Sequence, residues 1–371
     1  MDKQRSKKDI NRQKNESLKG TNRGSSRKSS DGSSYGSRWG AAEAGRGVKD
    51  ATHPFSGQAS SPGESIRFSR SGSGDTAEQT RKILEKAGLS PRKRFGQNFL
   101  IDEGVLDGIV AASGVGPLDV VLEIGPGIGT LTRRLAASAG KVLAVEIDRD
   151  LSEVLRETLA EFSNVRVINQ DVLKVDLRAL AEEHQAGTSR EHPLKITANL
   201  PYYITTPILM EIFRQKLPAS RITVMVQKEV AERMQAQQGS KAYGALSLAV
   251  QYYSKAEIVL EVPPESFYPR PKVSSAVISL DVYEKPRVSV PDEKLLFDLI
   301  SAAFSQRRKA LVNALGNASN IPVEQEEVEE ALRKMDLPLQ VRGEALSLEE
   351  YAKLTRLLHT EGQNNPDAMT E

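Results

Sequence analysis

Short apolar runs of strand length alternate with segments of helical period through the middle of the chain. Within the intervening segments, apolar positions recur every three or four residues. The pattern predicts strands at Val120–Ile124, Val142–Glu146, Val165–Asn169, Leu194–Ala198, Ile222–Val226, Glu257–Val262 and Ser275–Val282. Strands that alternate with helices indicate an α/β fold with a mainly parallel, doubly wound sheet.

The last two predicted strands differ from the others in how they are connected. Only the segment VPPESFYPRPKV joins them, and it is too short and too rich in proline for a crossover helix. We therefore expect an antiparallel, hairpin-like pair at one end of the sheet.

Beyond Pro291 the strand patterns stop and helical patterns take over. Three helices are predicted, at roughly 292–316, 323–335 and 347–359. The preceding segment has a proline near each end, which is typical of a linker. We predict an α/β domain at 81–286 and a small all-α domain at 287–371.

Residues 1–80 have a different composition, rich in Ser, Gly, Lys, Arg, Asn and Gln. They hold too little apolar surface to offset the entropy lost on ordering, so we predict a disordered tail, followed from Thr80 by a short amphipathic helix. The tail is either simply solvated or a basic arm that raises RNA affinity. Asp2 and Asp9 argue against a transit peptide. Whether the tail directs an organellar location stays open.

Composition excludes several classes of protein. The 371 residues include no cysteine, which rules out a disulfide framework, a thiolate zinc site and a cysteine nucleophile. The four histidines lack the spacing of metal ligands, so we expect no metal. There is no run of 18 apolar residues and no apolar leader, so we expect a soluble, cytoplasmic protein that does not contact membranes.

Charge is distributed unevenly along the chain. Residues 1–80 hold 15 Lys+Arg and 9 Asp+Glu, whereas the remainder holds 36 and 40. The part expected to fold is therefore slightly acidic, and any contact with nucleic acid must come from local basic clusters or from the tail.

A glycine-rich turn follows the first predicted strand. The sequence Glu123–Thr130 reads EIGPGIGT and leads directly into a helical pattern. Glycines here allow positive φ and let backbone amides approach a ligand at the carboxyl edge of the sheet. The spacing G-x-G-x-G, stiffened by proline, disfavours a dinucleotide, which needs G-x-G-x-x-G. Taken alone, the turn fits a nucleoside cofactor or a tight structural turn equally well.

Acidic residues stand at the ends of the next two strands. Glu146 ends the second strand and is placed to accept hydrogen bonds from both ribose hydroxyls of an adenosine. Asp171 follows the third strand and is a candidate acceptor for the exocyclic amine of adenine. Because carboxyl ends of parallel strands meet at one edge, these residues predict a site for an adenosine cofactor without phosphates, S-adenosylmethionine.

The fourth strand leads into Asn199-Leu200-Pro201-Tyr202. An exocyclic adenine nitrogen is a poor nucleophile because its lone pair is delocalised into the ring. The Asn199 side-chain oxygen and a main-chain carbonyl at Leu200 or Pro201 are candidates to bind both amine protons, and Tyr202 offers a ring for a flipped base. An asparagine-capped turn with a core tyrosine is the alternative at this point.

The chain from about Lys82 to His359 resembles the ribosomal RNA adenine N6,N6-dimethyltransferases, most closely their bacterial small-subunit branch. Eight blocks carry the resemblance in order: RKRFGQNFLID, VLEIGPGIGTLT, VLAVEID, INQDV, ANLPYYITTPI, VQKEVAERM, FYPRPKVSSAV and FSQRRKAL. The resemblance implies a monomer with a Rossmann-like class I methyltransferase sheet and a small all-α C-terminal domain. It implies dimethylation of two adjacent adenosines in the 3′-terminal hairpin loop of 16S rRNA, within an immature 30S subunit, and kasugamycin resistance when the enzyme is absent.

The resemblance also implies roles for particular residues. Binding of S-adenosylmethionine falls to Asn98, Leu100, Gly125, Gly127, Glu146, Ile147, Asp171, Val172 and Asn199. The catalytic set is Asn199, Leu200, Pro201, Tyr202 and Phe267. The target adenine is expected between Tyr202 and Phe267, although by sequence alone Phe267 fits core packing better.

Two basic clusters are candidates for contacts with RNA phosphates. They are Arg92, Lys93 and Arg94, which precede the segment FGQNFLID, and Arg307, Arg308 and Lys309, which we expect on a helix. Lys228 and Arg233 are weaker candidates.

Three other functions share some of these sequence features. A 23S rRNA adenine methyltransferase of the macrolide-resistance type shares the cofactor and NLPY-like blocks, but FSQRRKAL and the C-terminal module favour the small-subunit enzyme. A non-catalytic RNA-binding assembly factor is disfavoured by the complete cofactor and NLPY blocks. A nicotinamide dehydrogenase is disfavoured by the glycine spacing.

Overall fold

The computed structural model describes residues 73–92, 96–184, 186–187 and 194–363. The predicted disordered tail therefore lies outside the described residues up to position 72. From there the prediction differs from the structure, because helix α1 spans Ser73–Lys86 and begins seven residues before Thr80. Thr76, Thr80 and Leu84 form its buried face. Two of these three are polar, which is why hydrophobic periodicity missed the first turns.

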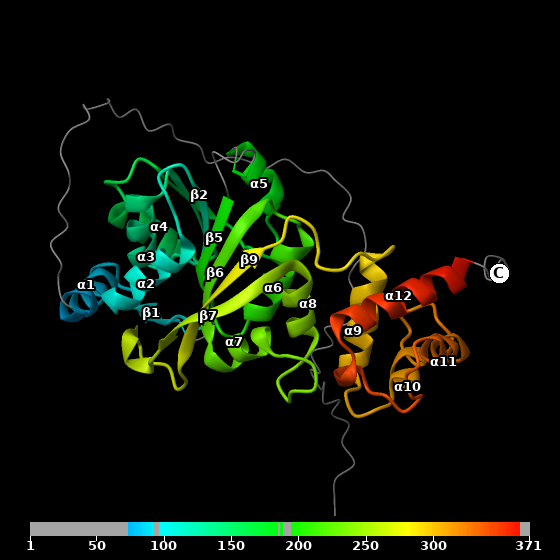
Figure 1. Cartoon of the computed structure of the whole chain (residues 1–371). Helices are drawn as coiled ribbons and strands as arrows, with labels where there is room; N and C mark the ends of the chain where they lie inside the picture. Colours follow the sequence, from blue (N-terminus) through cyan, green and yellow to red (C-terminus); the bar gives the residue numbers. More distant parts are fainter. Residues whose placement is uncertain (1–72, 93–95, 185, 188–193, 364–371) are drawn as a thin grey trace, which may run out of the picture. The chain divides into compact units, whose positions relative to one another are not determined.

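A seven-stranded sheet forms the centre of the fold (Figure 1). Its strands are β2 Val120–Ile124, β3 Lys141–Glu146, β4 Val165–Asn169, β5 Leu194–Asn199, β6 Ala219–Gln227, β7 Ser254–Val262 and β9 Ser275–Val282. They lie in the order β4-β3-β2-β5-β6-β9-β7. All seven predicted strands are confirmed, and their ends move by at most three residues.

Pairing within the sheet also agrees with the prediction. The five strands from β4 to β6 are parallel, while β9 is antiparallel to both β6 and β7. The antiparallel pair at one end of the sheet is thus confirmed. Since β2, β3, β4 and β5 run in the same direction, their carboxyl ends meet at one edge.

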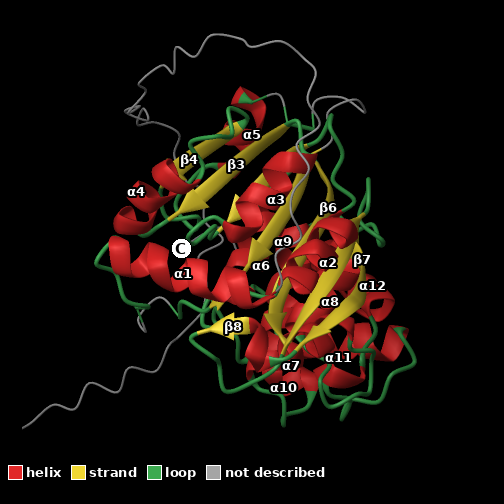
Figure 2. Cartoon of the chain, turned by 90° about the vertical axis from the view of Figure 1, so that its left-hand side faces the viewer, coloured by secondary structure: helices red, strands yellow, loops and turns green. Residues whose placement is uncertain are grey.

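Helices cover both faces of the sheet (Figure 2). They are α2 Glu103–Ser113, α3 Thr130–Ser138, α4 Arg149–Thr158, α5 Leu177–Glu183, α6 Thr205–Arg214, α7 Lys228–Gln235 and α8 Ala245–Tyr253. One core holds Leu122 of β2 with Ile208 of α6, and the other holds Val121 of β2 with Ile109 of α2. Successive β2 side chains therefore enter opposite cores, as expected for a sheet buried on both faces.

A two-stranded sheet was not predicted. Strand β1, Phe99–Leu100, pairs antiparallel with β8, Phe267–Tyr268. Strands of two residues have too little periodicity to be recognised in a sequence. This pairing joins segments far apart in the chain beside the carboxyl edge of the main sheet.

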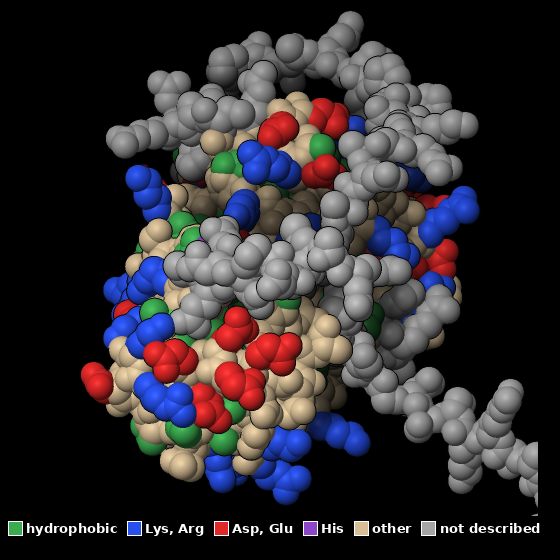
Figure 3. All heavy atoms as spheres, turned by 90° about the vertical axis from the view of Figure 1, so that its right-hand side faces the viewer, with side chains coloured by type: hydrophobic (Ala, Val, Ile, Leu, Met, Phe, Trp, Pro, Cys, Tyr) green, Lys and Arg blue, Asp and Glu red, His purple; other side chains and the backbone are tan. Residues whose placement is uncertain are grey.

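The C-terminal residues form the helices α9 Glu293–Ser305, α10 Leu311–Gly316, α11 Gln325–Lys334 and α12 Leu348–Gln363. Their core holds Leu299, Leu332 and Leu354 together with Leu248 and Tyr252 of α8. It is therefore continuous with a helix of the α/β part. On the face seen in Figure 3, basic and acidic side chains are intermixed.

The first predicted C-terminal helix is interrupted. The expectation that Arg307, Arg308 and Lys309 lie on a helix is wrong, because the chain turns between α9 and α10 at 306–310. Continuing α9 would carry Arg307 onto the face that buries Ile300 and Ala303. Burial of an unpaired guanidinium is costly, and the turn avoids it.

Among the residues that the structure describes, no helix has both the length and the apolar character needed to cross a membrane. The same residues contain no group of three or more histidine or acidic side chains placed to hold a metal ion.

Candidate functional site

A pocket opens at the carboxyl edge of the sheet, where the ends of β2, β3, β4 and β5 meet. It holds about 1030 Å³ of empty space, part of it open to solvent. All nine residues expected to bind the cofactor line it: Asn98, Leu100, Gly125, Gly127, Glu146, Ile147, Asp171, Val172 and Asn199. Sequence positions up to 101 residues apart are thus brought to one pocket.

The glycine turn after β2 forms one wall. Gly125 and Gly127 have φ of 70° and 63°, a region that favours glycine. The Gly125 amide donates to the Val145 carbonyl at 2.9 Å, which fixes the turn against β3. A Cβ on Gly127 would lie 3.3 Å from two atoms of the Phe99 ring. The turn therefore needs glycine for its conformation and for its close approach to β1.

Glu146 lies at the end of β3 with 5% of its surface exposed. Its Oε1 accepts the Asp148 amide at 2.8 Å and its Oε2 accepts the Gly127 amide at 3.2 Å. Burial raises the pKa of this carboxyl to about 7, and the backbone hydrogen bonds oppose that rise. The two amides hold the carboxyl group at the wall of the pocket.

The charge of the pocket lining is one-sided. Glu123, Glu146 and Asp171 contribute carboxyl groups, whereas the described lining residues include no lysine, arginine or histidine. Burial raises the pKa of Glu123 to about 8, and its Oε2 has no hydrogen-bond partner within the described structure. A lining without a cationic side chain offers no ion pair to a phosphate.

The Asn199–Tyr202 segment forms the wall at the end of β5. The Asn199 Nδ2 donates to the Asn98 carbonyl at 3.3 Å. The Pro201 carbonyl accepts from the Ile204 amide at 3.2 Å and from the Thr205 Oγ1 at 3.1 Å, where α6 begins. Of the two carbonyls left open by the sequence, that of Pro201 is therefore engaged, which favours Leu200.

Two tyrosines face this pocket. The Tyr202 hydroxyl lies 2.7 Å from the Ser275 Oγ, which anchors the ring to β9. Tyr203, which was not among the predicted site residues, also lines the pocket and is 55% exposed. Its ring lies 3.3 Å from the position a Cβ would take on Gly96. The doubled tyrosine in ANLPYY was the sequence signal for it.

Other residues of the lining were also missed. Among them are Gly96, Gln97, Phe99, Glu123 and Gln170. Each lies beside a predicted residue in the same block of sequence. Extending each block by one or two positions would have included them.

Phe267 lies apart from the pocket. The resemblance implied that it contacts the target adenine, but its side chain is 3% exposed and packs in the core with Leu100 and Val105. In β8 it stands opposite Leu100 of β1, and it is not part of the pocket lining. This position agrees with the core packing that the sequence alone favoured, and the contact of Phe267 with a target adenine stays a prediction.

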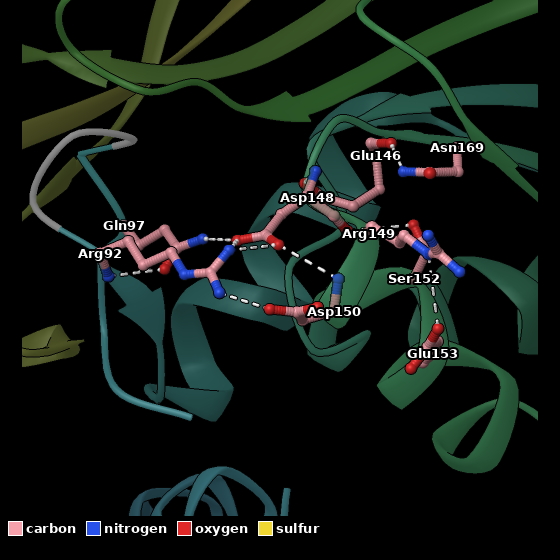
Figure 4. Close-up of polar contacts among 9 residues, drawn as sticks. All are labelled: Arg92, Gln97, Glu146, Asp148, Arg149, Asp150, Ser152, Glu153 and Asn169. Carbon is pink, nitrogen blue, oxygen red and sulfur yellow. Dashed lines mark hydrogen bonds and ion pairs between the residues drawn. The ribbon is translucent and has the colours of Figure 1, made fainter. Parts of the chain in front are cut away.

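In each of the two basic clusters, one described arginine is bonded to acidic residues of the protein. Lys93 and Arg94 lie outside the described residues. Arg92 bonds to Asp148 and Asp150 (Figure 4).

In the second cluster, Arg307 donates to Glu344 Oε2 at 2.6 Å and to the Lys241 carbonyl at 2.9 Å. Arg308 and Lys309 are exposed. Of the weaker candidates, Lys228 pairs with Glu261 at 2.7 Å and Arg233 is exposed.

Comparison with known proteins agrees with this arrangement. Residues 88–354 match the family model described as ribosomal RNA adenine dimethylase. The chain is 50% identical over 282 residues to Ribosomal RNA small subunit methyltransferase A of Lachnoclostridium phytofermentans, which covers 76% of this chain and 96% of that protein. It is 44% identical over 281 residues to the protein of the same name from Clostridioides difficile, and the match covers 76% of this chain and 95% of that protein.

Solved structures give the same result. A dimethyladenosine transferase from Plasmodium falciparum is 26% identical, with a TM-score of 0.59 over 71% of this chain and 98% of that chain. The 23S rRNA methyltransferase ErmE is 25% identical, with a TM-score of 0.52 over 71% and 100%. The fold is therefore that of the class I methyltransferases, and the chain belongs to the ribosomal RNA adenine dimethylase family.

Proposed function

We propose that this protein transfers methyl groups from S-adenosylmethionine to the N6 atoms of adenosines in 16S rRNA, giving N6,N6-dimethyladenosine. One observation carries the proposal. The Asn199–Tyr202 segment opens onto the same pocket as the glycine turn, Glu146 and Asp171. Residues that can bind the amine of a target adenine and residues that can bind an adenosine cofactor therefore line the same pocket.

The residues of the pocket fit S-adenosylmethionine. Glu146 would hold the ribose hydroxyls, and Asp171 the adenine amine. Ile147, which is 48% exposed, offers an apolar surface for the adenine ring. No lysine, arginine or histidine among the described lining residues would repel a ligand with positive charge. When bound, the cofactor supplies an electrophilic methyl group on a positively charged sulfur.

The chain's own residues prepare the adenine amine. The Asn199 Nδ2 donates to the Asn98 carbonyl, which fixes the plane of the side-chain amide and leaves Oδ1 as an acceptor. Oδ1 and the Leu200 carbonyl would accept the two amine protons, favouring a pyramidal nitrogen with an available lone pair. The ring of Tyr202 offers a stacking surface for a base taken out of its RNA loop.

Dimethylation adds a demand of its own. A monomethylated amine keeps one proton, so only one of the two acceptors stays bonded in the second transfer. The pocket must also admit the first methyl group. No strong general base is required, because the nitrogen becomes acidic as it is alkylated.

The finer assignment rests on the family and on the names of the relatives. We propose that the substrate is a pair of adjacent adenosines in the 3′-terminal hairpin loop of 16S rRNA, within an immature 30S subunit. We further propose that the enzyme acts as a monomer in the cytoplasm, and that a strain without it is resistant to kasugamycin. Arg308 and Lys309 are the described cations that we assign to RNA phosphates.

A methyl-transfer assay tests the proposal. Purified full-length protein is incubated with labelled S-adenosylmethionine and either immature 30S particles or 23S rRNA, and the RNA is digested and examined by mass spectrometry. We expect dimethyladenosine in the 16S digest and far less of it with Asn199→Ala. Transfer only to 23S rRNA would support the macrolide-resistance activity, which the similarity to ErmE makes the second candidate. RNA binding without transfer would indicate an assembly factor.

A further inference from the structure

Arg92 belongs to a cluster that the sequence assigns to RNA, but its described contacts point into the protein (Figure 4). Its Nη1 donates to both carboxylate oxygens of Asp148, at 2.8 and 3.0 Å, and its Nη2 donates to Asp150. The Asp148 side chain is only 3% exposed. The guanidinium is therefore the counter-charge of a nearly buried carboxylate, and its removal would leave that carboxylate without an opposite charge.

Gln97, a residue of the pocket lining, hydrogen-bonds to both Arg92 and Asp148. Its Oε1 accepts the Arg92 amide at 2.8 Å, and its Nε2 donates to Asp148 Oδ2 at 3.1 Å. Gln97 lines the pocket and precedes Asn98, whose carbonyl accepts from Asn199. Arg92 is thus linked through Gln97 to the segment that holds the Asn199 side chain.

Asp148 also hydrogen-bonds to Glu146, which lines the pocket at the end of β3. Its amide donates to Glu146 Oε1 at 2.8 Å, and its Oδ1 accepts the Asp150 amide at 3.2 Å, capping α4. The position of the Asp148 side chain and that of the Glu146 carboxyl are therefore set by one short turn. Arg92 bonds to this turn from a point 56 residues earlier in the chain.

We infer that Arg92 is a positioning residue for the methyl donor rather than a contact for RNA. Through Asp148 it holds the turn that orients Glu146, and through Gln97 it holds Asn98 against Asn199. An arginine is needed because its planar fork reaches two carboxylates. The inference rests on the proposed function, since it assumes that the pocket binds S-adenosylmethionine.

Donor affinity without RNA is the direct test. Full-length protein and its variants are titrated with S-adenosylmethionine by calorimetry. For Arg92→Gln we expect affinity to fall roughly tenfold, equivalent to about 1.4 kcal/mol and so to one charge-assisted hydrogen bond. Arg92→Lys keeps the charge but loses the fork, and should fall between the wild type and Arg92→Gln.

Arg149→Gln is the matched control. Arg149 lies on the same turn, but it pairs at 3.7 Å with Glu153 and its side chain is 84% exposed (Figure 4). Its donor affinity should stay within about twofold of the wild type, as expected for an exposed pair. An equal loss in Arg92→Gln and Arg149→Gln would overturn the inference, because the effect would then be one of net charge.

A double-mutant cycle with Asp150→Asn isolates the ion pair between Arg92 and Asp150. If the two residues act together, Arg92→Gln should weaken donor binding less in the Asp150→Asn background than in the wild type. Strictly additive losses would count against the inference. If Arg92→Gln fails to fold, Arg92→Lys and Asp150→Asn decide the matter, and unchanged donor affinity in both would overturn it.

RNA binding separates the two roles of Arg92. Affinity for a 16S rRNA fragment and its dependence on salt should both be unchanged in Arg92→Gln. Unchanged donor affinity with weaker RNA binding and a salt slope reduced by about one would identify Arg92 as a phosphate contact. Failure of the wild type to bind S-adenosylmethionine would overturn the proposed function, whereas normal wild-type binding with an unaffected Arg92→Gln would overturn this inference alone.

Discussion

The carboxyl edge of the sheet and the turn between α9 and α10 use charged residues in opposite ways. At the edge, Glu146 and Asp148 are buried and bonded to backbone amides, and Asp148 also bonds to Arg92. In the turn, Arg308 and Lys309 are exposed to solvent. The first region holds charges in fixed positions around a pocket, and the second presents them on the surface.

This difference indicates how a small ligand and a large polyanion are recognised by one chain. A pocket without a cationic side chain among its described lining residues offers no ion pair to a phosphate, whereas exposed cations attract phosphates. Substitutions in the two regions should therefore separate donor binding and turnover from RNA binding.

Asn199→Ala should have the largest effect. It removes the proposed acceptor for an amine proton, and we expect kcat to fall by about 100-fold or more, in line with the loss of a transition-state hydrogen bond. Measured RNA affinity should not change. Asn199→Asp keeps an acceptor oxygen and should retain more turnover than the alanine variant; equal rates for wild type and Asn199→Ala would remove this residue from the reaction.

Gly127→Ala should weaken donor binding by roughly tenfold, because a Cβ at φ 63° is strained and would also press on the Phe99 ring. Gly88→Ala is a close control, since Gly88 has φ 63° but nothing within 4 Å of its Cβ position. Both variants should lose about 1 kcal/mol of stability to backbone strain. Calorimetric titration that showed the same donor affinity in both would argue that the glycine turn does not contact the cofactor.

Combined Arg308→Gln and Lys309→Gln should act on the other region alone. We expect RNA affinity to fall about fivefold and the salt slope to flatten by roughly 1.5, while donor affinity stays the same. Arg333→Gln with Lys334→Gln is the control, an adjacent pair of the same residue types that is already bonded to Glu329 and Glu330. Equal losses in the two double variants, measured by filter binding at several salt concentrations, would assign the effect to net charge.

The smallest effect concerns the pH dependence of stability at Glu123. Burial raises the pKa of this carboxyl from 4.5 to about 8. Between these values the folded state keeps a proton that the unfolded state has lost, so the free energy of unfolding falls as pH rises through this window. Glu123→Gln cannot ionise and should gain roughly 5 °C in Tm relative to wild type at pH 9 compared with pH 5.

Glu257→Gln, an exposed position on β7, provides the reference for that measurement. Its Tm difference from wild type should be the same at both pH values. A difference for Glu123→Gln that does not depend on pH would mean that the carboxyl is not neutral in the folded protein at pH 5.

Much of the fold and of the pocket could be predicted because it depends on local pattern. The seven sheet strands have recognisable patterns of ordinary length, and Glu146 and Asp171 stand at or just beyond the end of such a strand. In contrast, the first turns of α1 escaped detection because their buried face is made by Thr76 and Thr80. The pairing of β1 with β8 escaped because two residues carry no period.

By itself, the sequence determined that Gly125, Glu146, Asp171 and Asn199 share one edge, since parallel strands joined by helices all end on the same side of their sheet. Only the tertiary structure decided where Arg92, Arg307 and Phe267 belong. An arginine run reads the same whether it meets water or a carboxylate 56 positions away, and an aromatic residue reads the same at a pocket or in a core. Those outcomes depend on distances between remote segments, which no local periodicity contains.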